Sequence, residues 1–358
     1  MKRAALVAVY IVATIQFVWC YFRMTLPWVN TAKYALGRER MPFQARMLMA
    51  LPMRWASHSR ALAWLAKAIS GHSVFWFPKP GSPEVVVQAA MDVGCLLLAG
   101  WLTTKIYRAS SNCRLLTWLI YLLFLAVCCA TYVMHTAQNF RFIYDFPSLA
   151  LFAAGMYLIY FRRHWVWFAV LFCVATVNRE TTLLLLPLYM LDNAVEDGRF
   201  AWPRVLGARA LAVVVPLAAL WIAWEIFVRH LFAHHRSEMY PRLDWNLKSL
   251  ALPLAWPQLL SAGGYLLLFV VAMHRKLVDP RLRAWLWVIP VWLVFMFPCG
   301  ILVETRIWGE LIPLIVCATA VICEEMLLVR MRVLTRRTAL AVVDAADVDG
   351  VSKVREAP

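Results

Sequence analysis

Three short charged stretches lie directly against long apolar runs, and their side chains are of the types that carry out acid–base chemistry or bind anions. They are residues 141–147, 177–182 and 304–310. An ionisable group next to hydrocarbon costs several kcal/mol unless it is paired or faces water, so such placement indicates a site rather than chance. If the topology argued below holds, all three stretches meet on the same side of a membrane.

Asp145 precedes Phe146 and Pro147 at the start of an apolar run. One interpretation is a helix N-cap, in which the carboxylate accepts from free backbone N–H groups and Pro147 lies in the first turn. The other is a general base, because a partly desolvated carboxylate has a raised proton affinity. Both interpretations can hold together.

Arg179 lies between Asn178 and Glu180, with apolar residues close on both sides. Asn178 could cap the following helix, and Glu180 would be favoured by the helix dipole. Arg179 requires an anionic partner, which could be Glu180, Asp145 or a phosphate, since guanidinium groups bind carboxylate and phosphate at two points. A purely structural ion pair is the alternative.

Glu304, Arg306 and Glu310 span two turns at the start of the last apolar run, so Arg306 and Glu310 should share one helical face. They could form a local salt bridge or contribute to an anion site. Asp92, inside an earlier apolar run, should face the protein interior as a polar helix contact.

The composition identifies the class of protein that contains these residues. Of 358 residues, 63% are hydrophobic and 16% are charged, whereas a soluble domain is about half apolar and a quarter charged. Because the apolar runs are continuous rather than alternating, we expect an all-α, polytopic transmembrane helical bundle. The net charge of +16 fits basic cytoplasmic loops better than a nucleic-acid partner.

The basic loops set the expected topology of about ten spans. The predicted spans cover residues 4–22, 85–104, 115–134, 146–161, 165–177, 181–191, 208–229, 258–274, 284–301 and 308–329. Every second loop is rich in Lys and Arg, which places both termini in the cytoplasm of a bacterial inner membrane. Residues 1–330 would form the transmembrane domain, and residues 331–358 a disordered cytoplasmic tail.

The first outward loop, residues 23–84, should carry helices that lie in the membrane interface. Between Pro42 and Trp55, an apolar stripe falls on one helical face, with Arg46 and Arg54 away from it. These arginines could extend to lipid headgroups or hold a phosphate. Residues 60–69 form a second amphipathic segment.

The Cys and His residues give no firm metal or disulfide pattern. His230, His234 and His235 have spacing that could hold a metal, but few carboxylates accompany them, so a polar loop is the simpler interpretation. No cofactor is expected, and a divalent metal is not indicated. Oligomeric state is open.

Together these features resemble the C-type glycosyltransferase superfold, and they also resemble uncharacterised bacterial membrane proteins usually placed near it. The resemblance is carried by residues 42–46, 144–147, 178–181 and 304–306 and covers about residues 1–330. It implies an enzyme that transfers sugar from a polyprenyl-phosphate carrier in the lipid bilayer to an acceptor on the extracytoplasmic face.

The first outward loop departs from the superfold, which usually keeps its catalytic Asp there. This loop has no Asp, and its carboxylates are Glu39 and Glu84. Either Glu39 replaces that Asp, or Asp145 or Glu180 is the base, or the protein does not transfer sugars. The predicted substrate-binding residues are Arg46, Arg141, Tyr144, Asn178, Arg179, Glu304, Arg306 and Glu310. The alternative functions are a flippase-like transporter or a structural subunit for lipid-linked glycans.

Overall fold

The computed structural model describes residues 2–71, 82–134 and 140–331, and the chain is a mostly helical bundle over these ranges. Five helices are long and apolar enough to cross a membrane: Ala4–Met24 within α1, Pro83–Ser110 (α5), Ala208–Leu231 (α11), Pro280–Cys299, and Thr305–Met331. Three shorter apolar helices accompany them: Ile120–Tyr132 (α6), Asp145–Tyr160 (α7) and Trp165–Asn178 (α8). These elements confirm the expected all-α bundle, with helices that are long and apolar enough to cross a membrane.

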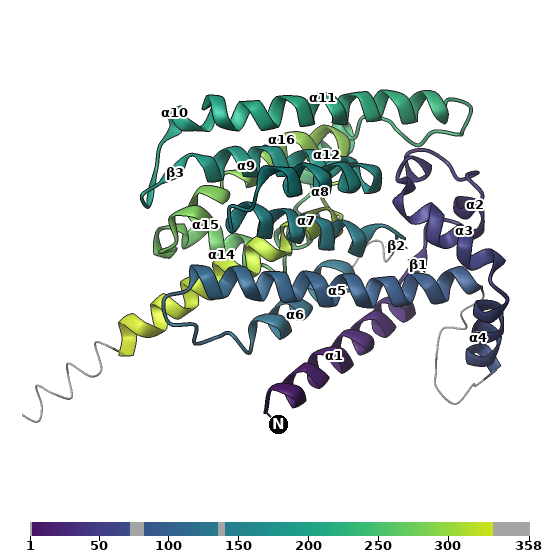
Figure 1. Ribbon diagram of the computed structural model, residues 1–358, viewed down its shortest axis with the longest axis horizontal. Helices are drawn as coiled ribbons and strands as arrows, with labels where there is room; N and C mark the ends of the chain where they lie inside the picture. Colours follow the sequence, from purple (N-terminus) through teal and green to yellow (C-terminus); the bar gives the residue numbers. More distant parts are fainter. Residues whose placement is uncertain (1, 72–81, 135–139, 332–358) are drawn as a thin grey trace, which may run out of the picture.

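The long helices lie side by side, and the connecting segments gather at the two ends of the bundle (Figure 1). At the first end lie α2 (Thr31–Ala35), η1 (Phe43–Ala45), η2 (Met47–Met49), α3 (Ala50–His58) and α4 (Arg60–Gly71). The strands β1 (Leu26–Pro27) and β2 (Phe140–Arg141) pair in parallel there. We call this the α3 end.

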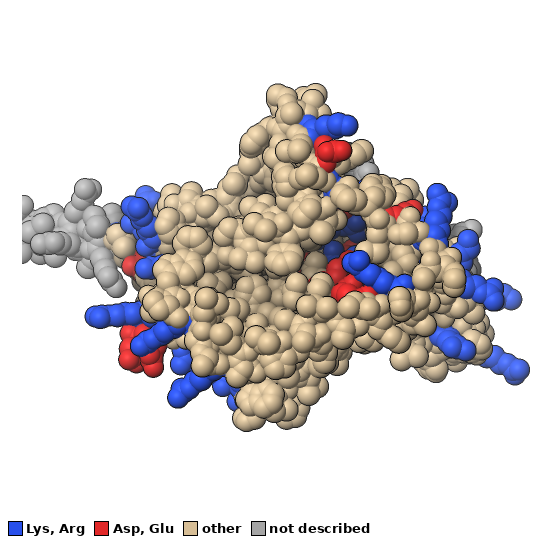
Figure 2. Space-filling model, turned by 90° about the horizontal axis from the view of Figure 1, so that it is seen from above, with Lys and Arg blue, Asp and Glu red and all other residues tan. Residues whose placement is uncertain are grey.

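The opposite end holds the hairpin of β3 (Val195–Glu196) and β4 (Arg199–Phe200), followed by α10 (Trp202–Val205). The remaining elements are α9 (Leu185–Asn193), α12 (Leu243–Ala251), α13 (Trp256–Leu260), α14 (Leu266–Ala272), α15 (Pro280–Trp285), α16 (Val288–Cys299), and the 3-10 segments η4 (Glu180–Leu184), η5 (Pro253–Ala255), η6 (His274–Lys276) and η7 (Thr305–Leu311). Blue and red side chains gather toward the two ends, with a broad tan surface between them (Figure 2).

Large aromatic side chains fill the core of the bundle. Trp285, Trp292, Phe124, Phe146 and Phe172 are fully buried and belong to one continuous cluster. Burial of such side chains is the main favourable term within a helical bundle. The outer side of α11 is different, since Ile222, Ile226 and Phe227 are exposed, as expected of residues that contact lipid.

A saturated polar cluster joins the helices at the β3–β4 end. Asp192, at 2% exposure, accepts hydrogen bonds from Arg281 Nε at 2.8 Å and Trp285 Nε1 at 3.1 Å. The Tyr160 hydroxyl donates to Asp279 at 2.7 Å. Because its partners are protein groups, this cluster serves to hold α7, α9 and α15 together.

Two local predictions were wrong. The apolar stripe expected between Pro42 and Trp55 is not one helical face, because regular α-helix begins only at Ala50. Met49 and Met53 are buried instead, while Leu51 and Trp55 are exposed. Residues 258–274 are not a continuous span either. Three successive residues from Gly263 to Tyr265 have positive φ, which ends one helix before the next begins.

The amphipathic segment expected at residues 60–69 is confirmed as a helix, α4, with Trp64 exposed. The predicted tail lies almost wholly outside the described residues, as does part of the segment between the predicted spans 115–134 and 146–161.

Candidate functional site

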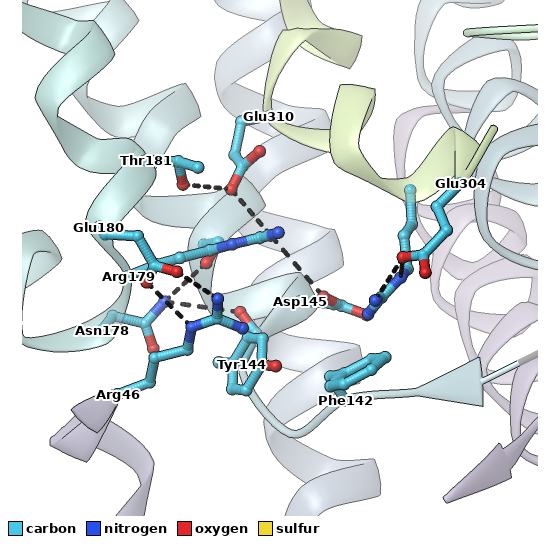
Figure 3. Close-up of polar contacts among 12 residues, drawn as sticks. Arg46, Phe142, Tyr144, Asp145, Asn178, Arg179, Glu180, Thr181, Glu304 and Glu310 are labelled. Carbon is cyan, nitrogen blue, oxygen red and sulfur yellow. Dashed lines mark hydrogen bonds and ion pairs between the residues drawn. The ribbon is translucent and has the colours of Figure 1, made fainter. Parts of the chain in front are cut away.

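The three charged stretches meet near the α3 end of the bundle, as the sequence led us to expect. Figure 3 shows side chains from the first loop, α7, the α8–η4 junction and η7 pointing toward one another. We call these residues the charged cluster: Arg46, Asp145, Arg179, Glu180, Glu304, Arg306 and Glu310.

Arg179 occupies the centre of the charged cluster. Helix α8 ends at Asn178, and Arg179 adopts an extended backbone (φ −161°, ψ 141°) before η4 begins. Its side chain is 6% exposed, and Nη1 lies 2.9 Å from Glu310 Oε1 and 3.7 Å from Asp145 Oδ1. One buried guanidinium therefore serves two buried carboxylates from different helices, while the Thr181 hydroxyl donates to Glu310 at 2.8 Å.

Asp145 is the first residue of α7 and is fully buried. The Tyr21 hydroxyl donates to Asp145 Oδ2 at 3.4 Å, and Arg306 lies within electrostatic range of the carboxylate. The N-cap position belongs to Tyr144, and the helix has no side-chain cap. The N-cap interpretation of Asp145 is therefore wrong, and its carboxylate faces the charged cluster instead.

Arg46 and Glu180 form a two-point ion pair. Arg46 Nε donates to Glu180 Oε2 at 3.0 Å, and Nη2 donates to Oε1. Burial raises the pKa of the Glu180 carboxyl, but the charge and hydrogen bonds of Arg46, together with the charge of Arg179 and a backbone hydrogen bond, outweigh burial and lower that pKa to about 2. Glu180 stays ionised at neutral pH and fixes the first loop against the α8–η4 junction. Arg46 thus pairs within the protein rather than extending to headgroups.

Arg306 pairs with Glu304, its near neighbour, through Nε at 2.8 Å and Nη2 at 2.6 Å. The predicted local salt bridge is confirmed, although its acid is Glu304 rather than Glu310. Aromatic rings of the β2–α7 segment lie against the guanidinium groups. Arg306 is 3.6 Å from the Phe142 ring centroid, and Arg46 is 4.2 Å from that of Tyr144. Such cation–π contacts orient each guanidinium.

Asn178 is the last residue of α8, so its predicted N-cap role is wrong. Its side-chain amide donates to the Ser148 hydroxyl at 2.8 Å and lies 3.5 Å from the Tyr144 carbonyl oxygen. It therefore joins α8 to the beginning of α7. This contact sets the position of Asp145 relative to Arg179.

Arg141 and Glu39 have other partners. Arg141 Nη1 donates to the carbonyl oxygens of Phe22 and Thr25 at 3.1 and 2.8 Å, where it caps the end of α1. Glu39 accepts from the backbone N–H groups of Asn30 and Arg40, both at 3.1 Å. Among the described residues, the contacts of its carboxylate lie in the first loop and not in the charged cluster. Its role as a base is still a prediction.

Sequence reasoning missed several residues at the site. Tyr21 lies in an apolar run that gave no sign of its contact with Asp145. Trp221 of α11 donates through Nε1 to the Glu180 carbonyl oxygen at 3.1 Å. Glu225, one turn further along α11, lies within electrostatic range of Glu180 and Arg46. A carboxylate inside an apolar run was the available signal for Glu225.

Over the described ranges, no group of three or more His, Cys, Asp or Glu side chains is arranged to hold a metal ion. His235, one of the three histidines considered from the sequence, contacts the Glu39 carbonyl oxygen through Nδ1 at 2.6 Å. The charged cluster can position and release protons, bind an anion through guanidinium donors, or hold helices in register. Comparison of the chain with protein-family models, with curated proteins and with solved structures gave no match.

Proposed function

We propose that this chain is a polytopic membrane glycosyltransferase of the C-type kind, which takes a sugar from a polyprenyl-phosphate carrier on the extracytoplasmic face of a bacterial inner membrane. The observation that carries the proposal is the position of Arg179, buried between Asp145 and Glu310 with Arg46 and Arg306 in the same cluster. A carboxylate beside several guanidinium groups suits a reaction in which a phosphate leaves.

In this proposal Asp145 takes the proton of an acceptor hydroxyl, whose oxygen bonds to the anomeric carbon as the bond from that carbon to the phosphate oxygen breaks. The polyprenyl phosphate leaves with the negative charge, which the guanidinium groups stabilise. Arg179 Nη1 is engaged by Glu310, but Nε has no hydrogen-bond partner among the described residues, so this donor is left for a phosphate oxygen. Glu180 and Glu304 orient Arg46 and Arg306.

Asp145 is a better candidate for the base than Glu39, because it lies beside the guanidinium groups whereas Glu39 accepts hydrogen bonds from its own loop. The test is transfer of labelled sugar from polyprenyl-phosphate donors in proteoliposomes. We expect Asp145→Asn to abolish transfer and Glu196→Gln, at the other end of the bundle, to leave it intact. Full activity in Asp145→Asn, Glu39→Gln and Glu180→Gln alike would reject the assignment.

The proposal includes about ten spans with both termini in the cytoplasm, and residues 258–274 would cross as a helix broken from Gly263 to Tyr265. The lengths of the five long helices support membrane crossing, and the basic loops support the orientation. Cysteine substitutions at Asp197 and Ser237, both exposed, should then react with an impermeant reagent from opposite sides of the membrane. Labelling of both from one side would exclude this topology.

A second candidate function is binding or translocation of a lipid-linked glycan without chemistry. It is favoured by the pairing of Arg46, Arg179 and Arg306 with carboxylates, which leaves no net positive charge in the cluster. The sugar-transfer assay separates the two functions. In a transporter, bound substrate would protect Arg179 from chemical modification, but no polyprenyl phosphate would be released.

A further inference from the structure

An apolar groove of about 230 Å³ lies between α1, α4 and α5, and none of the residues that line it belongs to the charged cluster. Its wall on α1 extends from Ile15 to Phe22, and its wall on α5 extends from Val85 to Val93. At 1.5 Å per residue, these walls are about 10 and 12 Å long. Ile69 of α4 also lines the groove, and every lining side chain is apolar. The groove, which we call the α1–α5 groove, therefore suits a hydrocarbon chain.

The position of the α1–α5 groove makes the bilayer the source of that chain. Helices α1 and α5 are both long and apolar enough to cross a membrane. The groove begins two residues from the end of α1 at Met24 and two residues from the start of α5 at Pro83, where lipid headgroups are expected to meet their chains. A chain gains little by leaving other lipid chains for an apolar groove, because both surroundings are equally apolar. Selective binding therefore needs a polar contact at the mouth of the groove.

Arg141 of β2 provides this contact. Its guanidinium carbon lies 4.6 Å from the ring centroid of Phe22, which itself lines the groove. The side chain is half-buried, so a headgroup can reach it. Among the described residues, both hydrogen bonds of the Arg141 side chain come from Nη1, which donates to the carbonyl oxygens of Phe22 and Thr25 at 3.1 and 2.8 Å. These bonds fix the guanidinium at the end of α1 and leave its Nε–Nη2 edge available.

The Nε–Nη2 edge of a guanidinium is the edge that binds an acid at two points elsewhere in this protein. Arg46 and Arg306 each use Nε and Nη2 to hold a carboxylate. At Arg141 no carboxylate of the described residues lies at ion-pair distance. Asp92 of α5, which is fully buried as predicted from the sequence, lies only within electrostatic range. A phosphate matches this edge at two points, so Arg141 has the geometry and the charge to bind one.

We propose that Arg141 and the α1–α5 groove bind an anionic phospholipid of the surrounding bilayer, with the phosphate on the Nε–Nη2 edge and one acyl chain in the groove. Phe22 makes the two parts continuous, because its ring contacts the guanidinium and lines the groove. The lipid joins α1, α4 and α5 at the α3 end. This inference goes beyond the proposed function and does not depend on it, so failure of the sugar-transfer assay leaves it unaffected.

The test titrates the full-length protein in detergent micelles with phosphatidylglycerol and uses native mass spectrometry to measure the Kd of the first bound lipid. We expect Arg141→Gln to weaken this binding about tenfold, the loss that follows removal of a hydrogen bond to a charged group. Arg163→Gln is the control, since Arg163 is an exposed arginine just beyond the other end of α7. Diacylglycerol, which has the same chains without the phosphate, should bind the unsubstituted protein about tenfold more weakly than phosphatidylglycerol.

Ala90→Leu tests the groove without changing Arg141. Ala90 is exposed and lines the groove, so a leucine occupies the space of the chain without entering the core. We expect it to weaken phosphatidylglycerol binding about fivefold by steric exclusion. The matched control is Ala223→Leu, at an exposed alanine of α11, which should bind like the unsubstituted protein.

Three outcomes would overturn the proposal. The first is unchanged affinity for phosphatidylglycerol in Arg141→Gln, or in Ala90→Leu if Arg141→Gln does not fold. The second is equal affinity of the unsubstituted protein for diacylglycerol and phosphatidylglycerol, which would remove the role of the phosphate. The third is displacement of phosphatidylglycerol by an equal concentration of polyprenyl phosphate, which would assign the α1–α5 groove to a carrier lipid instead.

Discussion

Arg46 and Glu180 face each other in a two-point ion pair although 134 residues separate them in the chain. Arg46 comes from the first loop, between η1 and η2, and Glu180 begins η4 after the break in α8. The pair therefore ties the segment at the α3 end to the helices that carry the charged cluster. The pair contributes to holding the first loop against these helices.

The Arg46–Glu180 pair makes stability depend on pH in the acid range. The pKa of Glu180 falls from its ordinary value of 4.5 to about 2, so its contribution is present above about pH 4.5 and is lost as pH falls toward 2. We expect Glu180→Gln to destabilise by about 1 kcal/mol near neutral pH, because the carboxylate is partly exposed and solvent screens it. Thermal unfolding of both proteins between pH 6 and pH 2.5 measures this, and the difference should shrink with acid. A stability difference between the two proteins that stays constant from pH 6 to pH 2.5 would contradict this prediction.

Arg179 is expected to be a large contributor to stability. Arg179→Ala leaves Asp145 and Glu310, at 0% and 1% exposure, without their shared partner. Removing one member of a buried ion pair costs about 3–5 kcal/mol, because the remaining charge is uncompensated. Unfolding in detergent micelles measures the loss. The matched control is Arg204→Ala, an exposed pair with Glu196, which should change stability by less than about 1 kcal/mol. Equal losses of stability in the two variants would show that burial of an ion pair does not determine its contribution to stability.

We expect any side chain at Gly309 to destabilise the fold. A Cβ at this position would lie 1.8 Å from the Tyr132 hydroxyl oxygen, so Tyr132 or η7 would have to move. Tyr132 packs edge-on against Phe146 at 5.0 Å, beside Asp145, and η7 carries Arg306 and Glu310. Gly309→Ala should cost about 1–3 kcal/mol through overpacking and should disturb the charged cluster.

Gly94 provides the control for this substitution. A Cβ at Gly94 meets nothing within 4 Å, so Gly94→Ala in α5 should be neutral or stabilising. Tyr132→Phe should partly restore the stability of Gly309→Ala, because it removes the atom in closest contact. Unfolding of the three variants by the same method gives the comparison. If Tyr132→Phe does not restore stability to Gly309→Ala, the overpacking arises from a contact other than the Tyr132 hydroxyl.

Helix α11 is expected to contact lipid along one side. Ile226 is 59% exposed, whereas Val228 is 1% exposed only two residues later. A nitroxide label at Ile226→Cys should be accessible to dissolved oxygen in a bilayer, while one at Val228→Cys should be shielded by protein. Power-saturation electron paramagnetic resonance measures both. Equal accessibility would mean that α11 does not pack as the structure has it.

The sequence predicted the parts of the fold that depend on composition and on local charge. The apolar run at residues 208–229 became α11 (Ala208–Leu231) within a few residues, because apolar length alone specifies such a helix. The meeting of Asp145, Arg179 and Arg306 was also predicted, since ionisable groups beside hydrocarbon must find partners.

Other features depend on backbone geometry or tertiary partners, which no local pattern contains. Asn178 matches the residue types of an N-cap, but α8 continues through it and ends there. Glu39 has the chemistry of a base, yet backbone N–H groups of its own loop already satisfy it. The contact of Tyr21 with Asp145 joins residues 124 positions apart, so nothing near either residue announced it.

The polar cluster around Asp192 has a mechanical consequence for the whole bundle. At the β3–β4 end, Asp192, Arg281 and Trp285 hold α9 and α15 through several mutual hydrogen bonds. At the α3 end, Arg179 and three residues of α5, Glu84, Gln88 and Asp92, have buried polar atoms that lack hydrogen-bond partners among the described residues. The polar groups of the Asp192 cluster are therefore paired, whereas the α3 end combines ion pairs with buried polar atoms that have no hydrogen-bond partner among the described residues. A bulky headgroup that enters at the α3 end is therefore expected to move the helices apart there, while the Asp192 cluster holds them together at the β3–β4 end.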